Sequence, residues 1–264
     1  MIRAEEVEFS YNTRVVLRGV SFRIGDGEMV GMIGPNGSGK TTLLRLMSGI
    51  LRPTSGNINI AINGLSFEPF YIKRRSVAKY VSVLPQNPVV PDDFTVEDVV
   101  LMGRYAVSRS ISYNRDDYDI CLRAMSDVGI AHLKDRLVGQ LSGGELKRAL
   151  IARTLAQETD IVLLDEPTAN LDIAGKEKIM ALIVKRCRER NMTLVVVMHD
   201  IGLAARHMPR LILISDGKII ADGEPGVVLS EENILGAYGI ETEVLWYRGE
   251  LVIKPQTGNK EEER

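Results

Sequence analysis

One segment constrains the fold of this chain more than any other, and it matches the pattern G-x-x-x-x-G-K-[ST] in full: Gly34-Pro35-Asn36-Gly37-Ser38-Gly39-Lys40-Thr41. A short apolar run, Met29–Ile33, precedes it, and apolar residues at helical spacing follow it. The glycines let consecutive backbone N–H groups point inward around an anion, and the positive end of the following helix adds attraction. Lys40 is then placed to reach the outer phosphates of a nucleotide, and the Thr41 hydroxyl, with Thr42 beside it, to bind Mg²⁺. A flexible glycine-rich turn is the alternative, but the flanking strand and helix favour a nucleotide site.

Strands and helices alternate along most of the chain, which predicts an α/β fold with a P-loop core and a mostly parallel sheet. The run Met29–Ile33 is typical of a strand buried on both faces. Further strands are expected at residues 57–62, 80–84, 161–164, 193–198, 211–214 and 218–221. Near the N-terminus apolar and polar residues alternate, which predicts an antiparallel β subdomain. The apolar positions of that pattern are Val7, Phe9, Val20, Phe22 and Ile24.

The middle of the chain has helical periodicity and no strong strand signal, so we expect an inserted α-helical subdomain at about residues 90–157. Residues 1–240 would form one nucleotide-binding domain. Residues 241–264 would add a β-hairpin, with strands at Val244–Tyr247 and Leu251–Ile253 and a glycine turn between them. The last residues, Asn259–Arg264, are too polar to pack and are expected to fray.

Composition excludes several classes of protein. The chain has 264 residues, 45% of them hydrophobic, which rules out wholesale disorder. Lys and Arg number 33 against 35 Asp and Glu, and this balance argues against a dedicated nucleic-acid binder. Only two cysteines occur, Cys121 and Cys187, so a disulfide framework or zinc cluster is not expected. The N-terminus resembles no secretory signal, and no apolar stretch approaches the ~18 residues that span a bilayer.

A second polar feature ends an apolar strand. Ile161–Leu164 is followed directly by Asp165 and Glu166. In a parallel sheet the carboxyl end of such a strand opens onto the ligand crevice. Asp165 could then hold Mg²⁺, and Glu166 could orient a water for attack on the γ-phosphate. A solvated strand end is the alternative, but the nearby phosphate-binding motif favours the catalytic interpretation.

A third feature, Leu141-Ser142-Gly143-Gly144-Glu145, starts an apolar-periodic helix. Ser142 and Glu145 fit a capping box, which is a purely structural device. Two glycines in a first helical turn each cost roughly 1 kcal/mol relative to Ala, and a cap needs neither. They are explained if an anion approaches the helix N-terminus closely. Since the chain then has two phosphate-type sites but one lysine-bearing loop, a nucleotide clamped between two copies is suggested.

Together these motifs, with Pro167 after the two carboxylates, resemble the nucleotide-binding subunit of ATP-binding cassette (ABC) transporters over about residues 1–235. The resemblance implies ATP and Mg²⁺ as cofactors, ATP hydrolysis coupled to transport, a homodimer, and membrane permease subunits as partners. It also implies a peripheral location on the cytoplasmic face of the membrane and indirect cooperation with an extracytoplasmic substrate-binding protein. Nucleic acid is not an expected partner.

Smaller elements of the family occur in order. Tyr11 matches the aromatic residue that stacks on adenine, and Gln86 matches the glutamine that senses Mg²⁺ and links to the membrane partner. Asp172 matches the acidic residue of the loop that crosses to the other subunit. His199 matches the histidine that contacts the γ-phosphate. With Lys40 and Glu166, His199 completes the expected catalytic set; Thr41, Gln86 and Asp165 are the expected metal site.

Softer similarity suggests a cargo class. The run Val99–Tyr105 and the segment Gly239–Val244 resemble importers of iron-siderophore complexes, haem or cobalamin, and an oxyanion such as molybdate remains an alternative. Glu145 stands where many family members have Gln, but both residues can cap the helix. A soluble cassette ATPase acting on DNA or ribosomes would carry a coiled-coil insertion or a second cassette, and neither is visible. A small-molecule kinase would leave Ser142–Glu145 without a role.

Overall fold

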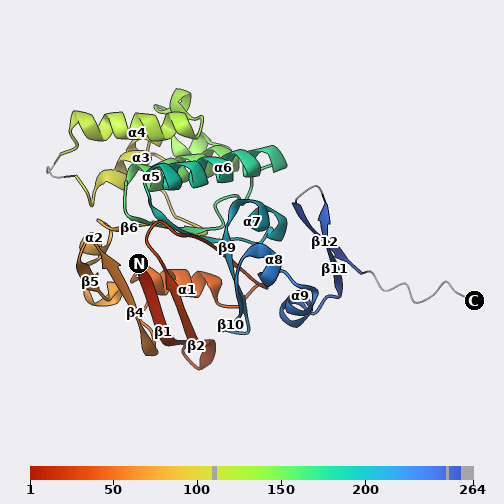
Figure 1. The fold of residues 1–264 in the computed structure, drawn as a ribbon. Helices are drawn as coiled ribbons and strands as arrows, with labels where there is room; N and C mark the ends of the chain where they lie inside the picture. The colour runs from red at the N-terminus through yellow and green to blue at the C-terminus, as the bar shows by residue number, and fades with distance from the viewer. Residues whose placement is uncertain (109–111, 248–249, 257–264) are drawn as a thin grey trace, which may run out of the picture.

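The computed structural model describes residues 1–108, 112–247 and 250–256. Its centre is a six-stranded sheet in the order β10-β9-β3-β8-β7-β6 (Figure 1). Every neighbouring pair is parallel except β9 and β10, which pair antiparallel at the edge. The predicted α/β fold with a mostly parallel sheet is therefore confirmed. The strands are β3 Met29–Ile33, β6 Val81–Leu84, β7 Ile161–Asp165, β8 Thr193–Val197, β9 Arg210–Ser215 and β10 Lys218–Gly223.

Both faces of this sheet are buried, because alternate residues of each central strand enter two different hydrophobic cores. In β3, Val30 and Met32 join the core that lies against the antiparallel sheet. Met29 and Ile33 join the core beneath the helices on the opposite face. A strand with two buried faces needs apolar residues at successive positions rather than at every second one, as the sequence of β3 has.

The N-terminal residues form a separate antiparallel sheet in the order β2-β1-β4-β5. Ile2 lies at its centre, opposite Ile24 on one side and Ile60 on the other. Helix α1 (Lys40–Met47) lies between this sheet and the central sheet in Figure 1, and its buried Leu43, Leu44 and Leu46 belong to the core they share. The strands are β1 Ile2–Tyr11, β2 Arg14–Ile24, β4 Ser55–Ile62 and β5 Leu65–Phe67.

Helices cover the other face, and those of the middle segment form a layer at the top of Figure 1. Several begin at a side-chain cap that the sequence supplies, including complete capping boxes at Thr95, Asn114 and Ser142. The remaining helices are α2 Arg74–Val77, α3 Val96–Leu101, α4 Arg115–Asp127, α5 Gly143–Ala156, α6 Ile173–Glu189, α7 Ile201–His207, α8 Pro225–Val228 and α9 Glu231–Tyr238. Short 3-10 turns lie at Pro69–Tyr71, Met102–Arg104, Ala131–Leu133 and Val138–Gln140.

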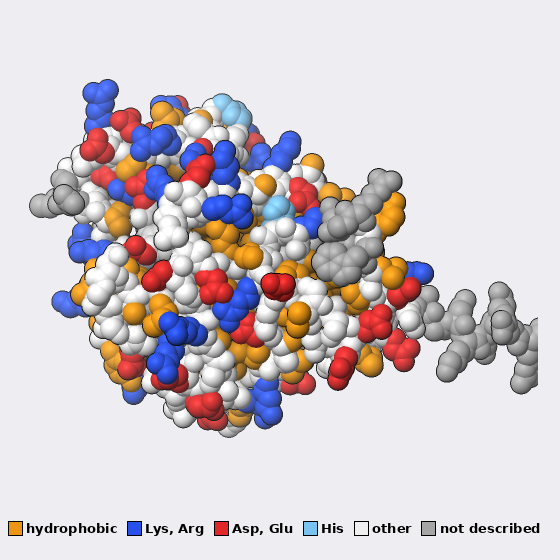
Figure 2. All heavy atoms as spheres, in the orientation of Figure 1, with side chains coloured by type: hydrophobic (Ala, Val, Ile, Leu, Met, Phe, Trp, Pro, Cys, Tyr) orange, Lys and Arg blue, Asp and Glu red, His pale blue; other side chains and the backbone are white. Residues whose placement is uncertain are grey.

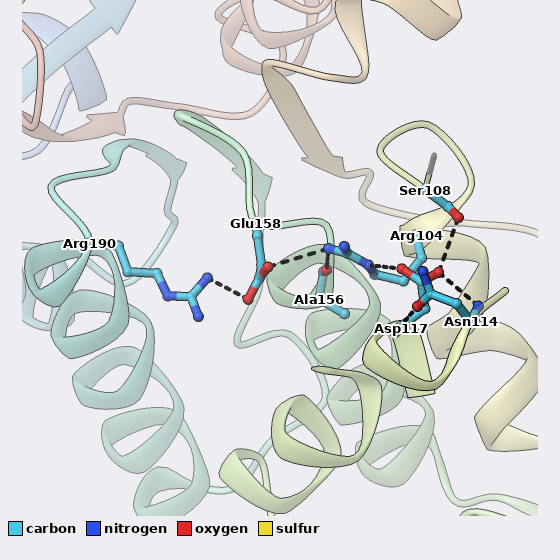
Figure 3. A network of polar contacts seen from close by, with 7 residues as sticks. All are labelled: Arg104, Ser108, Asn114, Asp117, Ala156, Glu158 and Arg190. Atoms are coloured by element: carbon cyan, nitrogen blue, oxygen red, sulfur yellow. Dashed lines mark hydrogen bonds and ion pairs between the residues drawn. The ribbon is translucent and has the colours of Figure 1, made fainter. Parts of the chain in front are cut away.

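A buried polar network ties the middle helices to the rest of the molecule (Figure 3). The Arg104 guanidinium donates to Asp117 on α4 over 2.9 Å and to the carbonyl of Ala156 at the end of α5 over 2.7 Å. It also lies 3.5 Å from Glu158, which pairs with Arg190 just beyond α6 at 2.6 Å. The network therefore runs from α4, across the end of α5, to the end of α6.

Strands β11 (Thr242–Tyr247) and β12 (Glu250–Pro255) pair with each other, and β12 contacts α7. The turn expected at 248–249 and the tail expected to fray at 259–264 fall outside the described residues. Cys121 and Cys187 are both buried free thiols, and burial raises the pKa of each to about 12. Among the described helices, none combines the length and apolar character needed to cross a bilayer.

Candidate functional site

The phosphate loop (Gly34–Thr41) connects the carboxyl end of β3 to the first turn of α1, and its backbone requires glycine at specific places. Gly34 has a φ of 144°, and a Cβ there would lie 1.9 Å from the carbonyl oxygen of Ile214. Gly39 has a φ of 107° and caps α1. Only glycine adopts these conformations readily. The glycines thus allow the loop to fold, and the helix that follows it directs its positive N-terminal end towards the loop.

Lys40 begins α1, and its ammonium lies inside the loop. The Nζ atom donates to the carbonyls of Gly34 at 2.9 Å and Pro35 at 2.7 Å, and it lies 3.4 Å from the Ser38 hydroxyl. The residue is 5% exposed. Burial lowers the pKa of Lys40, while attraction to Glu166 and Asp165 opposes that shift. The amine is thereby held at the floor of the loop, beside the carboxylates predicted to work with it.

Asp165, the last residue of β7, contacts Thr41 of α1, although 124 positions separate them in the sequence. The Thr41 hydroxyl donates to its Oδ1 at 3.2 Å, and Asp165 is 2% exposed. Burial raises the pKa of Asp165, and the Thr41 hydrogen bond opposes the shift. A hydroxyl and a carboxylate side by side supply the hard oxygen atoms that Mg²⁺ prefers. No cluster of three or more His, Cys, Asp or Glu suited to a metal occurs in the described part of the chain.

Glu166 brings two further predicted residues together. Its Oε1 accepts from Gln86 Nε2 at 2.6 Å and lies 2.6 Å from His199 Nε2. Glu166 also has a φ of 50°, in the left-handed region that costs a non-glycine residue energy. Such strain persists only where the surroundings impose it, and it re-aims the carboxylate after the end of β7. The structure thus places Glu166, Gln86 and His199 in one cluster.

These groups line a cavity of about 780 Å³, within the range of small-molecule and cofactor sites. Tyr11 forms part of its wall, is 41% exposed, and packs edge-on against Phe9 with ring centroids 4.8 Å apart. An exposed ring held in this way offers a flat face to a base. The lining residues are Tyr11, Arg14, Val16, Asn36, Gly37, Gly39, Lys40, Thr41, Thr42, Gln86, Glu166 and His199.

The signature segment (Ser142–Glu145) does not line this cavity. It starts α5 with the capping box that the sequence predicted: Ser142 Oγ accepts from the Glu145 N–H at 3.3 Å, and Glu145 Oε2 accepts from the Ser142 N–H at 2.8 Å. The Ser142 hydroxyl also donates to Glu145 Oε2 at 2.7 Å, and this hydrogen bond, together with that from the Ser142 N–H, lowers the pKa of Glu145. Asp172 caps α6 through the Gly175 N–H at 2.7 Å. Neither segment lines the cavity, and four other predicted site residues do not line it either: Gly34, Pro35, Ser38 and Asp165.

Three residues at the site were missed by sequence reasoning. Arg14 and Val16 line the cavity beside Tyr11, because β2 turns back along β1. Their only signal was proximity to Tyr11 in the sequence. Lys147 on α5 is 6% exposed and interacts electrostatically with Glu166 and Asp165. Its signal was helical position, since it falls on the same face as the buried Leu150 and Ile151.

The chain has close relatives among characterised proteins. It is 37% identical over 245 residues to the ferric enterobactin transport ATP-binding protein FepC of Escherichia coli, covering 92% of this chain and 89% of that protein. It is 38% identical over 252 residues to the hemin import ATP-binding protein HmuV of Gloeobacter violaceus, covering 93% and 90%.

Solved structures share the fold. A chain of an ABC transporter assigned to the metal-chelate type, in an inward-facing conformation, superposes with a TM-score of 0.80 at 26% identity and 97% coverage of both chains. A bacterial ABC transporter cassette solved as a dimer gives a TM-score of 0.76 at 28% identity, covering 85% of this chain and 99% of that one. The family model described as ABC transporter matches residues 17–169. With the motifs and their geometry, these matches show that the chain belongs to the ABC transporter family, as an ATP-binding subunit.

Proposed function

We propose that the chain is the ATP-hydrolysing subunit that powers a membrane importer of an iron complex, a siderophore or haem, or of cobalamin. The relatives support the cargo class, because they include proteins named for ferric enterobactin, hemin and petrobactin. The matches to the ferric enterobactin and petrobactin proteins each cover 92% of this chain and 89% of the relative.

One observation supports the proposal that a second copy completes the ATP site. The signature segment does not line the cavity, and nothing within the described protomer requires its glycines. A Cβ at Gly143 would meet no atom within 4 Å, and one at Gly144 would make an ordinary 3.4 Å contact with Leu171. The free space at this helix N-terminus would therefore accommodate a phosphate bound to a second copy. Each ATP would lie between the phosphate loop of one protomer and the signature segment of its partner.

The residues of the chain then have distinct tasks. Lys40 would exchange its carbonyl partners for phosphate oxygens and stabilise the charge that develops during transfer. Glu166 would accept the proton of the attacking water, and His199 would steady the γ-phosphate. Gln86 and His199 both contact Oε1 of Glu166, which leaves Oε2 to accept the proton of the water.

Thr41 and Asp165 would hold Mg²⁺, and the Gln86 side chain could add an amide oxygen. Their chemistry fits, since all three can offer oxygen atoms and Mg²⁺ also keeps phosphate and water ligands. Bound there, Mg²⁺ neutralises negative charge on the phosphates.

The membrane partner would dock on the face near Gln86 and the middle helices, with the chain lying against the cytoplasmic side of the membrane. Two exposed aromatic rings flanked by guanidinium groups, the composition typical of interface anchors, are the candidates for this contact. Arg75 lies 4.9 Å from the ring centroid of Tyr105, and Arg52 lies 5.2 Å from that of Tyr71. Tyr71 is 60% and Tyr105 63% exposed.

The docking face is tested by co-expression with the permease. Tyr105→Ala should reduce the permease that co-purifies by at least about tenfold, since truncating an aromatic anchor costs ~2 kcal/mol. The ATPase activity of the isolated chain should stay unchanged, because Tyr105 does not line the cavity. Leu235→Ala, which removes a half-exposed apolar side chain from α9, outside the middle helices, is the control. Equal recovery of the permease with both variants would contradict this placement.

The function itself is tested with Glu166→Gln. This variant should bind Mg-ATP as well as the parent chain, fall at least about 10²-fold in turnover, and accumulate as an ATP-bound dimer. Turnover is measured as released inorganic phosphate, and the dimer by size-exclusion chromatography with light scattering. Hydrolysis at the parent rate would refute the role assigned to Glu166. Transfer of the labelled γ-phosphate to a metabolite rather than to water would refute the transport ATPase.

A further inference from the structure

An arginine that belongs to none of the sequence motifs lies in the wall of the ATP cavity. Arg14 is the first residue of β2, is exposed, and lines the cavity together with Tyr11 and Lys40. Within the described residues its guanidinium makes no hydrogen bond, ion pair or ring contact. A guanidinium carries five N–H donors and stays charged at every physiological pH. These donors are therefore free to bind a ligand in the cavity.

The hairpin between β1 and β2 fixes Arg14 beside Tyr11. Its loop consists of Asn12 and Thr13 alone, and Asn12 has a φ of 51°, which asparagine tolerates better than most residues. Across this loop Tyr11 pairs directly with Arg14. Residues directly opposite each other in an antiparallel pair project from the same face of the sheet. The guanidinium therefore leaves the sheet on the same side as the ring that offers its face to a base.

The charge of the cavity wall gives this position a consequence. Among the residues that line the cavity, Arg14 and Lys40 are the two that are always cationic. The Lys40 ammonium lies inside the phosphate loop, where it would meet the outer phosphates. A nucleotide with its base on Tyr11 and its outer phosphates in that loop has its inner phosphates, those nearest the ribose, between the two ends. Arg14 is the cation at the Tyr11 end.

A second cavity, of about 850 Å³, adjoins the first and provides a control residue. Arg14, Val16 and Gly37 line both cavities, so Arg14 lies at the boundary between them and shares it with the phosphate loop. Arg18 also belongs to β2 and is also exposed, but it lines the second cavity only. Like Arg14, it makes no side-chain hydrogen bond or ion pair within the described residues. The two arginines thus differ in whether they face the ATP cavity.

We propose that Arg14 is a nucleotide-binding residue whose guanidinium donates to the inner phosphates of ATP, while Lys40 binds the outer ones. This inference rests on the proposed ATP site. The planar fork of a guanidinium matches two phosphate oxygens at once, and hydrogen bonds to an ionised oxygen are stronger than those between neutral groups. ATP and ADP both keep the inner phosphates, so Arg14 holds substrate and product alike. It contributes to nucleotide affinity and not to the transfer of the γ-phosphate.

Calorimetric titration of the full-length chain with Mg-ADP measures this contact without hydrolysis. Arg14→Met removes the charge and the donors but keeps an unbranched side chain, so the Kd for ADP should rise about tenfold. In the ATPase assay the loss should appear as a higher KM for ATP. Arg14→Lys keeps the charge without the fork and should weaken ADP binding by about threefold. Arg18→Met removes the same charge from the same strand and should leave the Kd within about twofold.

Adenosine separates a phosphate contact from a disturbed base site. It has the base and the ribose but no phosphate, so its affinity should be equal in the parent chain and Arg14→Met. A displaced Tyr11 ring would weaken adenosine as well, and that result would overturn the proposal.

An unchanged Kd for ADP in Arg14→Met would also overturn it, as would an equal loss in Arg18→Met, which would indicate a general effect of surface charge. If Arg14→Met does not fold, Arg14→Gln keeps a polar end and should weaken ADP binding in the same direction. Failure of the parent chain itself to bind ADP would instead refute the ATP site under the proposed function.

Discussion

Single glycines at the two phosphate-type segments have different physical justifications. Gly34 cannot be replaced within its own protomer, since its φ is 144° and a Cβ would run into the Ile214 carbonyl at 1.9 Å. Gly143 is free of both constraints: it starts α5, and an added Cβ has open space around it. The first glycine is needed for folding, whereas the second is explained only by a ligand that comes from outside.

This contrast predicts opposite outcomes for two substitutions. Gly34→Ala should destabilise the fold by about 3 kcal/mol through backbone strain and collision, and nucleotide binding should be lost with it. Gly143→Asp should leave thermal stability within about 0.5 kcal/mol, because a carboxylate in a first helical turn suits the helix dipole.

Gly143→Asp should nevertheless abolish ATP-driven dimer formation, since it places a negative charge where the second copy's phosphate would bind. Calorimetric unfolding and light scattering with ATP measure the two effects separately. A Gly143→Asp chain that still dimerises with ATP at the parent concentration would remove the anion-binding role of the signature segment.

The sequence predicted which residues form the site better than it predicted their backbone conformation and hydrogen bonds. Motif order named Lys40, Asp165 and Glu166 from the sequence, because phosphate and metal chemistry admits few side chains at those points. The left-handed backbone of Glu166 and its bonds to Gln86 and His199 were not predictable, since they arise where β7, β6 and β8 end side by side. Lys147 escaped notice because a lysine in a helix is usually assigned to the exposed face.

At the scale of elements, long strands and capped helices were predictable because their signals are local. The expected strand at 161–164 is β7, which extends one residue further to Asp165. Helix α9 was missed although Ser230 caps it, because its eight residues show little amphipathic pattern. The four-residue helices α2 and α8 are too short for periodicity to reveal them.

The polar network of Figure 3 makes α4 an element whose stability depends on charge. Asp117 is 2% exposed, and although burial alone would raise its pKa, the hydrogen bonds from Arg104, Asn114 and Ser108 outweigh burial and lower it. Asp117→Asn should cost about 3 kcal/mol of unfolding free energy, because it leaves Arg104 buried without its counter-charge. Asp116→Asn changes an exposed position in the same turn and should cost only ~0.5 kcal/mol of unfolding free energy.

The interaction between Asp117 and Arg104 predicts that the stability of the fold depends on pH. The folded-state pKa of Asp117 lies below its ordinary value of 3.8, so the stabilisation is complete above pH 3.8. It is lost as pH falls through the lower folded-state pKa. Urea unfolding between pH 2 and pH 6 should therefore show the parent and Asp117→Asn curves converging at low pH. Parallel curves over this whole range would show that the Asp117 charge does not stabilise the fold.

For the whole molecule, the sequence predicted the class of fold but not the arrangement of its sheet. The order β10-β9-β3-β8-β7-β6 places the first strand of the core between two late ones, and local patterns carry no information on such non-local pairing. The face shown in Figure 2 mixes acidic and basic side chains, in keeping with the near-neutral composition. The site depends on this arrangement, because it joins the ends of β3, β6, β7 and β8.

The shared site predicts how activity depends on the concentration of the chain. If each ATP needs the phosphate loop of one copy and the signature segment of another, the monomer is incomplete as an enzyme. Specific ATPase activity of the isolated chain should then rise with protein concentration and level off once the dimer dominates, whereas a self-contained site gives a constant value. Phosphate release by the parent chain is measured over a hundredfold dilution range at saturating Mg-ATP, and sedimentation velocity follows the same chain under the same conditions. Full specific activity in samples that sediment entirely as monomer would show that one copy encloses its ATP alone, and the two-copy site would have to be abandoned.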